Sequence, residues 1–278
     1  MFDRIERVWR GLGTGFFLAL IGLGGSAMAL TVFPLIALLA RDPERRRRRI
    51  QWVLHHSFRL YCGAIHALRI ADIEICGAER LKALRGTLIV ANHPSLLDVV
   101  MIMAAVPSVQ CVVKGGLWKN PFFRLTVEGA GYIRNDLAPE DLMAACVATL
   151  RQGNNLIIFP EGTRTIPGEP MKARRGFANV ATVAEANVQL VSITCEPPVL
   201  HKGNPWWRVP RRRSSFRLAV GDNLDIKGFL SYGFRPLAAR KLVATVEQYY
   251  ADRSAHGRTG IGNQATDRER IETRGLVA

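Results

Sequence analysis

Apolar residues follow two different spacings along most of the chain, and the two spacings alternate. Short runs that are almost entirely apolar predict buried strands, and longer stretches with an apolar residue at every third or fourth position predict helices. The runs lie at 73–75, 86–91, 109–113, 155–159, 188–195 and 214–221, and the helical stretches lie at 50–70, 139–153, 174–187 and 235–253. This alternation predicts an α/β fold in which helices flank a mixed, mostly parallel central sheet.

The N-terminal part of the chain follows neither spacing. No charged residue occurs from Gly11 to Ala40, and this stretch exceeds the roughly 20 residues that a helix needs to cross a bilayer. Such a run without a polar face is unusual for a buried helix of a soluble protein, so we predict a membrane-embedded helical segment. The glycines at 22–25 and Pro34 are possible breaks. A single tilted helix and a re-entrant hairpin of two half-length helices are therefore both compatible with the sequence.

The charges around this segment divide the chain into three parts. We predict a membrane-embedded segment with a basic flank at residues 1–49, a globular domain at 50–253 and a polar, disordered tail at 254–278. Arginines occur before the apolar run at positions 4, 7 and 10, and after it at positions 41 and 45–49. The larger excess after the run predicts that the domain faces the cytoplasm. An arginine run beside a membrane segment also predicts contacts with lipid headgroups.

Composition narrows the classes of partner. The formal net charge of +15 and the isoelectric point of about 10.4 call for an anionic partner, such as nucleic acid, anionic lipid or a phosphorylated substrate. The apolar segment favours lipid, and because the chain has no stacked-aromatic RNA motif we expect no nucleic-acid partner. The five cysteines are scattered without a C-x-x-C pair, which predicts reduced core residues and neither a disulfide framework nor a zinc site.

Two polar side chains stand out in the apolar stretch from Ala91 to Val106. A buried carboxylate is costly without a partner, and the nearest partner for Asp98 is His93, five residues earlier. Pro94 suits the first position of a helix, so we predict that His93 lies in the preceding turn and folds back over the helix. The carboxylate would then hold one ring nitrogen and leave the other as a base. The alternative is a capping histidine beside a solvated aspartate, because the pattern is short.

The second polar cluster, FPEGTRT at 159–165, also follows a predicted strand. Both clusters therefore belong at the carboxyl ends of strands, where the sites of α/β folds gather. Arg164 lies within the second cluster, while Lys114 and Arg134 belong to a further basic set. Guanidinium groups in a tight polar loop suit phosphate binding. The alternative is an ordinary turn with a solvated basic face.

Taken together, these motifs resemble those of the glycerolipid acyltransferase family, which includes lysophosphatidic acid acyltransferase. The resemblance rests on NHPSLLD at 92–98, GYIRND at 131–136 and FPEGTRT at 159–165, in the order and spacing of the family. ITCEPP at 193–198 stands where the family has a fourth, more apolar motif. The resemblance spans roughly residues 86–198, and the combination of FPEGTRT with the H-x-x-x-x-D pattern is its specific part.

The resemblance implies a membrane-bound O-acyltransferase. His93 would be the general base that takes the proton from an acceptor hydroxyl, and Asp98 would orient it. The hydroxyl would attack the thioester of acyl-CoA or of acyl carrier protein, a co-substrate, so that no cofactor, no metal and no cysteine is needed. The residues expected to hold the acceptor, particularly its phosphate, are Lys114, Arg134, Glu161, Gly162, Thr163 and Arg164.

The expected acceptor is a lysophospholipid, 1-acylglycerol-3-phosphate, which would give phosphatidic acid. The expected partners are membrane lipids, this acceptor and the acyl donor, at a bacterial-type inner membrane with the catalytic domain in the cytoplasm. Cys195 and Glu196 depart from the family, as does the basic, tryptophan-containing stretch at 200–216. This stretch is compatible with a membrane interface, with a solvated hairpin and with docking of an acidic carrier protein. The departures leave two alternatives open, a different lipid-like acceptor and a non-catalytic lipid-binding protein of the same fold.

Overall fold

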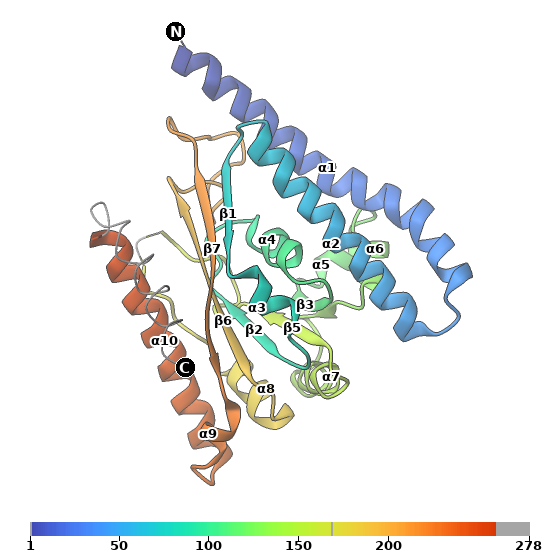
Figure 1. Ribbon diagram of the computed structural model, residues 1–278, viewed down its shortest axis with the longest axis vertical. Helices are drawn as coiled ribbons and strands as arrows, with labels where there is room; N and C mark the ends of the chain where they lie inside the picture. The colour runs from blue at the N-terminus through green and yellow to red at the C-terminus, as the bar shows by residue number, and fades with distance from the viewer. Residues whose placement is uncertain (1, 168, 260–278) are drawn as a thin grey trace, which may run out of the picture.

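Pairing of the predicted strands builds the centre of the molecule. The computed structural model describes residues 2–167 and 169–259, and it contains a seven-stranded sheet in the order β1-β7-β6-β2-β5-β3-β4 (Figure 1). The strands are β1 (Asp72–Cys76), β2 (Leu88–Ala91), β3 (Val109–Val113), β4 (Ile133–Arg134), β5 (Asn155–Ile158), β6 (Val188–Glu196) and β7 (Ser215–Leu224). All neighbours pair in parallel except β6 and β7. The predicted mixed, mostly parallel sheet is confirmed.

Helices cover both faces of this sheet. The layer on one face is formed by α4 (Asp98–Ala105) and α2 (Pro43–Ala67), with α1 (Phe2–Leu39) outside them (Figure 1). The other face carries α7 (Pro139–Arg151), α8 (Gly176–Ala184) and α10 (Arg235–Thr259). The short helices are α3 (Ala78–Lys82), α5 (Gly116–Lys119), α6 (Arg124–Gly129) and α9 (Ile226–Leu230). Because both faces are covered, central strands such as β2 are apolar at every position rather than at alternate ones.

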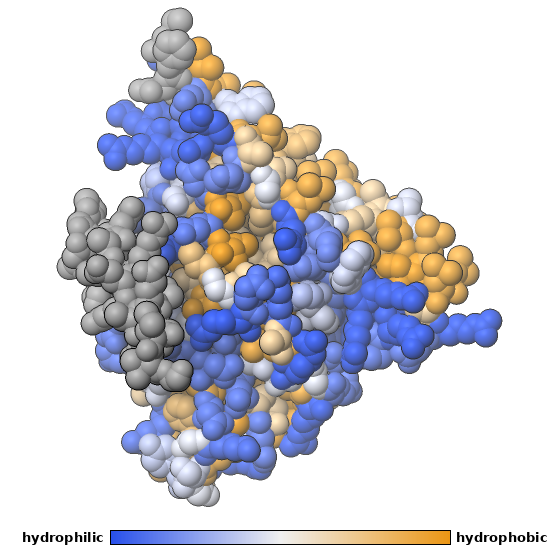
Figure 2. Space-filling model, viewed as in Figure 1, coloured by the Kyte–Doolittle hydropathy of each residue, from blue (hydrophilic) through white to orange (hydrophobic). Residues whose placement is uncertain are grey.

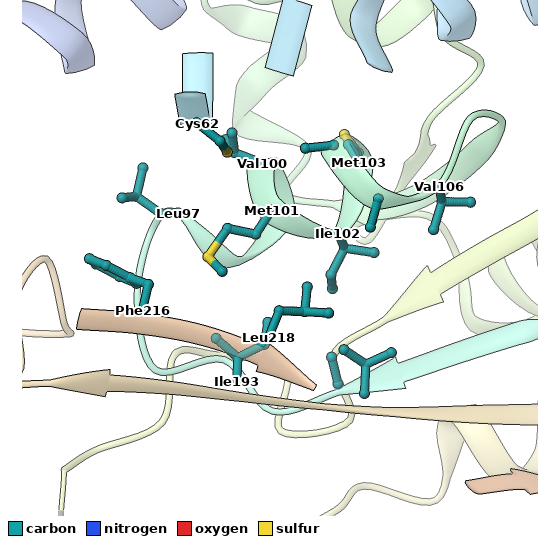
Figure 3. Packing of buried hydrophobic residues seen from close by; sticks show 14 of the residues in the cluster. Cys62, Leu97, Val100, Met101, Ile102, Met103, Val106, Ile193, Phe216 and Leu218 are labelled. Carbon is teal, nitrogen blue, oxygen red and sulfur yellow. The ribbon is translucent and has the colours of Figure 1, made fainter. Parts of the chain in front are cut away.

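Each face of the sheet has its own apolar core. Leu88 and Val90 of β2 pack among α7, α8 and α10, whereas Ile89 and Ala91 pack on the side of α4. Figure 3 shows α4 above the sheet, with Met101 and Ile102 directed toward side chains of β6 and β7. The buried residues that they meet there are Ile193, Phe216 and Leu218. The loops at the strand ends are thus supported by rigid packing on both sides.

The N-terminal segment is one continuous helix, with Pro34 inside it. Its 38 residues span about 57 Å at 1.5 Å per residue. Among the described residues it is the one helix long and apolar enough to cross a membrane, and only 22% of its apolar window is buried. It nevertheless packs along the domain, where Phe17 and Phe33 are buried and the Ser26 hydroxyl donates to the Phe122 carbonyl at 2.9 Å. Of the two arrangements compatible with the sequence, the structure has the single helix.

Some predicted boundaries differ from the observed ones. Pro94 does not begin a helix, because α4 starts at Asp98 and the Ser95 N–H donates to the Asp98 carboxylate at 2.7 Å. The carboxylate therefore stands at the first helical position and not in the second turn. The limit predicted at residue 49 falls inside α2, which already contains the arginine run. The tail predicted from residue 254 overlaps α10, which continues to Thr259, and residues 260–278 lie outside the described part of the chain.

Removing a core aromatic side chain will destabilise the domain. Phe216 has no exposed surface, so Phe216→Ala should lower the free energy of unfolding by about 3–5 kcal/mol, the usual result of emptying such a site. Urea denaturation followed by tryptophan fluorescence measures this loss. The matched control is Phe234→Ala, because Phe234 is 64% exposed and should change stability little. Equal effects of the two substitutions would contradict this view of the core.

Candidate active site

The two polar clusters meet because their strands are neighbours in the sheet. β2 and β5 pair in parallel, with Val90 opposite Ile158, so the chain leaves both strands at the same edge. His93 follows β2 by two residues, and the cluster at 159–165 continues directly from β5. A cleft of about 400 Å³ opens at this edge, which is within the size range of small-molecule sites.

His93 and Asp98 form a hydrogen-bonded pair. The His93 Nδ1 atom lies 2.8 Å from Asp98 Oδ2, and because a carboxylate only accepts, Nδ1 carries the proton. This arrangement fixes the tautomer and leaves Nε2, which has no hydrogen-bond partner among the described residues, as a free acceptor. The imidazole stacks on the Phe159 ring with centroids 4.2 Å apart. The His93 side chain lines the cleft and keeps 18% of its surface exposed, as a base that must reach a substrate requires.

The Asp98 side chain is completely buried in this arrangement, which is costly for a carboxylate. Its side chain has no exposed surface, and although Oδ2 accepts from His93 and from the Ser95 N–H, Oδ1 has no partner among the described residues. Burial raises the pKa of Asp98 above its ordinary value, and the hydrogen bond from His93 opposes that shift. A half-satisfied buried carboxylate is unfavourable for stability, which is typical of a group retained for its chemistry.

A network of hydrogen bonds ties the two clusters together. The His93 N–H donates to Glu161 Oε1 at 3.2 Å, and the Thr165 hydroxyl donates to the same oxygen at 2.6 Å. The Thr165 N–H in turn donates to the His93 carbonyl at 2.7 Å. Burial raises the pKa of Glu161, although the hydrogen bond from Thr165 opposes that shift. The backbone of the histidine is therefore fixed by the loop that follows β5.

Most of the predicted acceptor-binding residues line the cleft. Gly162, Thr163 and Arg164 line the cleft from the loop after β5, and Lys114 lines it from the loop after β3. Gly162 has φ +69°, a left-handed conformation that favours glycine. The Arg164 guanidinium donates to the Leu200 carbonyl at 2.7 Å, which fixes the side chain along the cleft. These cations give one end of the cleft a positive charge suited to an anionic group.

Two predicted residues are placed differently. Glu161 does not line the cleft, since its Oε1 atom is used by the His93 N–H and the Thr165 hydroxyl. The Arg134 guanidinium forms two hydrogen bonds to Asp136, at 3.0 and 2.9 Å, and also does not line the cleft. Its neighbour Asn135 does line it. Glu161 therefore holds the backbone of His93 in position and does not face the cleft. The acceptor-binding roles of all six residues stay predictions.

The structure adds three residues that sequence reasoning did not assign to the site. Lys202 reaches the cleft from the loop between β6 and β7, and its only signal was its place in a basic stretch. Phe159 supplies the ring beneath His93. Asn92 joins the end of β2 to β6, because its amide donates to the Ile193 carbonyl at 2.7 Å and accepts from the Ile193 N–H at 2.8 Å. The motif NHPSLLD contains Asn92, but its pairing depends on a strand a hundred residues away.

The thiol that lines the cleft is not suited to nucleophilic attack. Burial raises the pKa of Cys111 to about 12, so this thiol stays protonated near neutral pH. A second cavity of about 40 Å³ lies between α1, α2 and the loop before β7, where Phe17, Tyr61 and Phe216 line it. It has room for a few water molecules at most, so an acyl chain does not fit it in this conformation.

Comparison with known proteins supports the resemblance to glycerolipid acyltransferases that the motifs indicate. Residues 72–196 match the family model described as Acyltransferase, and this segment contains both polar clusters. The chain is 28% identical over 187 residues to the chloroplastic 1-acyl-sn-glycerol-3-phosphate acyltransferase LPAT1 of Arabidopsis thaliana, covering 64% of this chain and 50% of that protein. It is 36% identical over 139 residues to the 1-acyl-sn-glycerol-3-phosphate acyltransferase of Helicobacter pylori, covering 48% and 57%. The chain thus spans about half the length of these curated relatives.

A solved structure shares the fold. The crystal structure of the 1-acyl-sn-glycerophosphate acyltransferase PlsC from Thermotoga maritima matches with a TM-score of 0.66 at 19% identity. The match covers 89% of this chain and 97% of that one, so it extends well beyond residues 72–196 to the flanking elements. The predicted resemblance to the glycerolipid acyltransferase family is confirmed, and so is the predicted fold class.

Loss of the Glu161 carboxylate should loosen the site. Glu161→Ala removes the acceptor of the Thr165 hydroxyl and one of the two acceptors of the His93 N–H, the other being the Thr165 hydroxyl oxygen at 3.1 Å. This loss should lower the free energy of unfolding by about 1–3 kcal/mol. Glu161→Gln keeps an oxygen at this place and should retain most of the stability. Thermal unfolding of the two variants beside the unmodified protein measures the difference. A Glu161→Ala variant as stable as the unmodified protein would show that the network does not support the site.

Proposed function

We propose that this protein is a membrane-associated O-acyltransferase that transfers an acyl chain from a thioester to the hydroxyl group of a lysophospholipid. The observation that carries the proposal is the hydrogen bond of His93 Nδ1 to the buried Asp98, which leaves Nε2 as a base at the edge of the cleft. The names of the similar proteins point to 1-acylglycerol-3-phosphate as the acceptor and phosphatidic acid as the product. The thioester belongs to acyl-CoA or to acyl carrier protein.

The proposed reaction uses His93 and Asp98 together with the acceptor hydroxyl and the thioester of the donor. His93 Nε2 takes the proton of the acceptor hydroxyl as its oxygen attacks the thioester carbonyl carbon. The carbon–sulfur bond of the resulting tetrahedral intermediate breaks, and the imidazolium returns its proton to the departing thiolate. Asp98 stabilises the imidazolium in between and keeps the ring oriented. An ester and a free thiol result, and no acyl-enzyme forms.

The cations of the cleft suit the phosphate of the proposed acceptor. Lys114, Arg164 and Lys202 line it together with His93, so one ligand can contact a cation and the base at once. Arg164 is already oriented by the Leu200 carbonyl, so less of its conformational freedom remains to be lost on binding. Charge-assisted hydrogen bonds to a phosphate would hold the glycerol hydroxyl beside Nε2.

The position of α1 supports attachment to one leaflet rather than a crossing. Arg10 and Ser26 of α1 hydrogen-bond to the domain, at the Arg211 and Phe122 carbonyls, and Phe33 is buried. A helix that is docked over this length suits a position along the near leaflet, with the domain beside it. Its outer residues, such as Leu12 and Leu30, each 68% exposed, would enter the apolar part of the near leaflet. This arrangement brings the domain to the surface from which a lysolipid would come.

Replacing the base should abolish transfer. His93→Ala should lower the rate of ester formation by about 10²–10⁴-fold, because it removes proton transfer from the acceptor. The assay follows transfer of a labelled acyl group from acyl-CoA or acyl carrier protein to a panel of lysolipids, with product mass analysis. His56→Ala is the matched control, since His56 is exposed on α2 and its ring, within the described part of the chain, hydrogen-bonds to the Trp52 carbonyl alone. Undiminished turnover by a folded His93→Ala variant would remove the mechanism.

The same panel tests the acceptor. Ester formation with 1-acylglycerol-3-phosphate supports the proposal as stated, whereas ester formation only with another lipid-like acceptor would correct the substrate and keep the mechanism. No ester with any acceptor and either donor would favour a non-catalytic lipid-binding protein.

The lysines of the cleft should affect phosphorylated acceptors selectively. Lys114→Ala and Lys202→Ala should each raise the KM for 1-acylglycerol-3-phosphate by about tenfold, in keeping with the loss of one charge-assisted contact. The kcat/KM for an acceptor without a phosphate, such as monoacylglycerol, should change less. Lys172→Ala is the control, because Lys172 is exposed and lies outside the cleft. Equal losses with both acceptors would place the phosphate elsewhere.

A further inference from the structure

The loop between β6 and β7 combines exposed tryptophans with a high positive charge. We refer to residues 201–213 as the Trp-Arg loop. Trp206 and Trp207 are 44% and 63% exposed, and their rings meet edge to face at 5.7 Å. The family match ends at residue 196, before this loop begins, and only Lys202 of the loop reaches the cleft. The rest of the loop is therefore not explained by the proposed chemistry.

The loop is built onto the N-terminal half of α1. The Trp206 ring covers Gly15 so closely that a Cβ atom there would lie 2.7 Å from it, and Val209 approaches Gly11. The buried Arg10 guanidinium donates to the Arg211 carbonyl at 2.7 Å. The loop is thus held against the helix, and its surface adjoins that of α1.

Three arginines of the loop have no acidic partner. Arg208, Arg211 and Arg212 are exposed and form no ion pair among the residues that the structure describes, whereas the adjacent Arg213 pairs with Asp72 at 2.8 Å. Arg211 and Arg212 also line an open depression beside the end of β6, together with Arg213 and Glu196. An anion in this depression would meet more guanidinium groups than carboxylates, so the lining stays net positive despite Glu196.

An apolar strip lies next to these cations. Leu12 and Phe16 of α1 are 68% and 60% exposed, and at 3.6 residues per turn they lie within about 100° of Gly15, which Trp206 covers. Figure 2 shows hydrophobic surface along the edge where Figure 1 draws α1, with hydrophilic surface beside it toward the N-terminal end. Arginines and a tryptophan at the border of an apolar strip match the layering of headgroups and acyl chains at a bilayer surface.

We propose that the Trp-Arg loop is a second membrane contact, which binds the phosphates of anionic lipids through Arg208, Arg211 and Arg212 and inserts Trp207 at the interface. The proposal rests on the membrane association proposed above and adds selectivity for anionic lipid. An acidic carrier protein would satisfy the arginines but would leave the apolar strip of α1 uncovered, so the bilayer is the better match. Because Lys202 belongs to both loop and cleft, this contact also sets the cleft beside the headgroups.

Vesicle binding by the full chain tests this proposal. Sedimentation with phosphatidylcholine vesicles is compared with sedimentation with vesicles that contain one-third phosphatidylglycerol. Arg208→Ala combined with Arg211→Ala and Arg212→Ala should weaken binding to the anionic vesicles by at least about tenfold, since each basic residue near such a surface adds to its electrostatic attraction. Binding to the neutral vesicles, which α1 provides, should change less than about twofold. The corresponding arginine-to-lysine triple variant should keep the preference for anionic vesicles, which separates loss of charge from a folding defect.

The control variant removes the same number of positive charges from outside the Trp-Arg loop. Lys227→Ala with Arg240→Ala and Lys241→Ala removes three exposed cations near α9 and α10 and should leave the preference intact. Trp207→Ala should reduce binding to both kinds of vesicle by about the same factor. The proposal is overturned if the arginine variant binds anionic vesicles like the unmodified protein, if the control loses as much, or if the arginine variant loses only affinity for acyl carrier protein. None of these readouts requires acyl transfer, so failure of the catalytic proposal is distinguishable.

Discussion

The parallel pairing of β2 with β5 is the constraint on which the site depends. It brings two chain segments, far apart in sequence, out of the sheet side by side, and hydrogen bonds between His93, Glu161 and Thr165 then lock them together. The imidazole is held by its backbone, by the Phe159 ring and by Asp98. Such over-determination suits the role that we propose for His93, because a general base must be held within a narrow geometric tolerance.

Asp98 shows what this precision requires. The carboxylate is fully buried, and one of its two oxygens has no partner among the described residues. The apolar packing of α4 against β6 and β7, with Met101 and Phe216 in it, supplies the stability that offsets this group. The acidic side chain in an otherwise apolar stretch is therefore a local defect of the core, which the proposed role of His93 as a base would explain.

The sequence predicted the strands and the sheet class because central strands, buried on both faces, leave continuous apolar runs. It also predicted the pairing of His93 with Asp98, but with the wrong local structure. The start of α4 at Asp98 follows from the Ser95 N–H bonding to the carboxylate, a contact that competes with a helix begun at Pro94. Glu161 could not be placed, since its orientation depends on the His93 N–H of another strand end. Lys202 could not be placed either, since it reaches the cleft only through the fold of the loop between β6 and β7. The local pattern of apolar residues is enough to predict the helices and strands. Which polar side chains face the cleft depends on tertiary contacts, which that pattern does not show.

The topology has a consequence for the order of events during synthesis. Within the described sheet, β1 is an edge strand and has β7 as its one neighbour, with Asp72 opposite Ser215. This pairing can form only after Ser215 has left the ribosome. α1 and α2 emerge long before the surface on which they pack is complete, and such late, non-local pairing slows folding. A nascent chain with an early apolar helix and a late sheet is exposed to aggregation in water. If α1 contacts a lipid surface first, the bilayer itself would protect the unfinished domain until its last strand arrives.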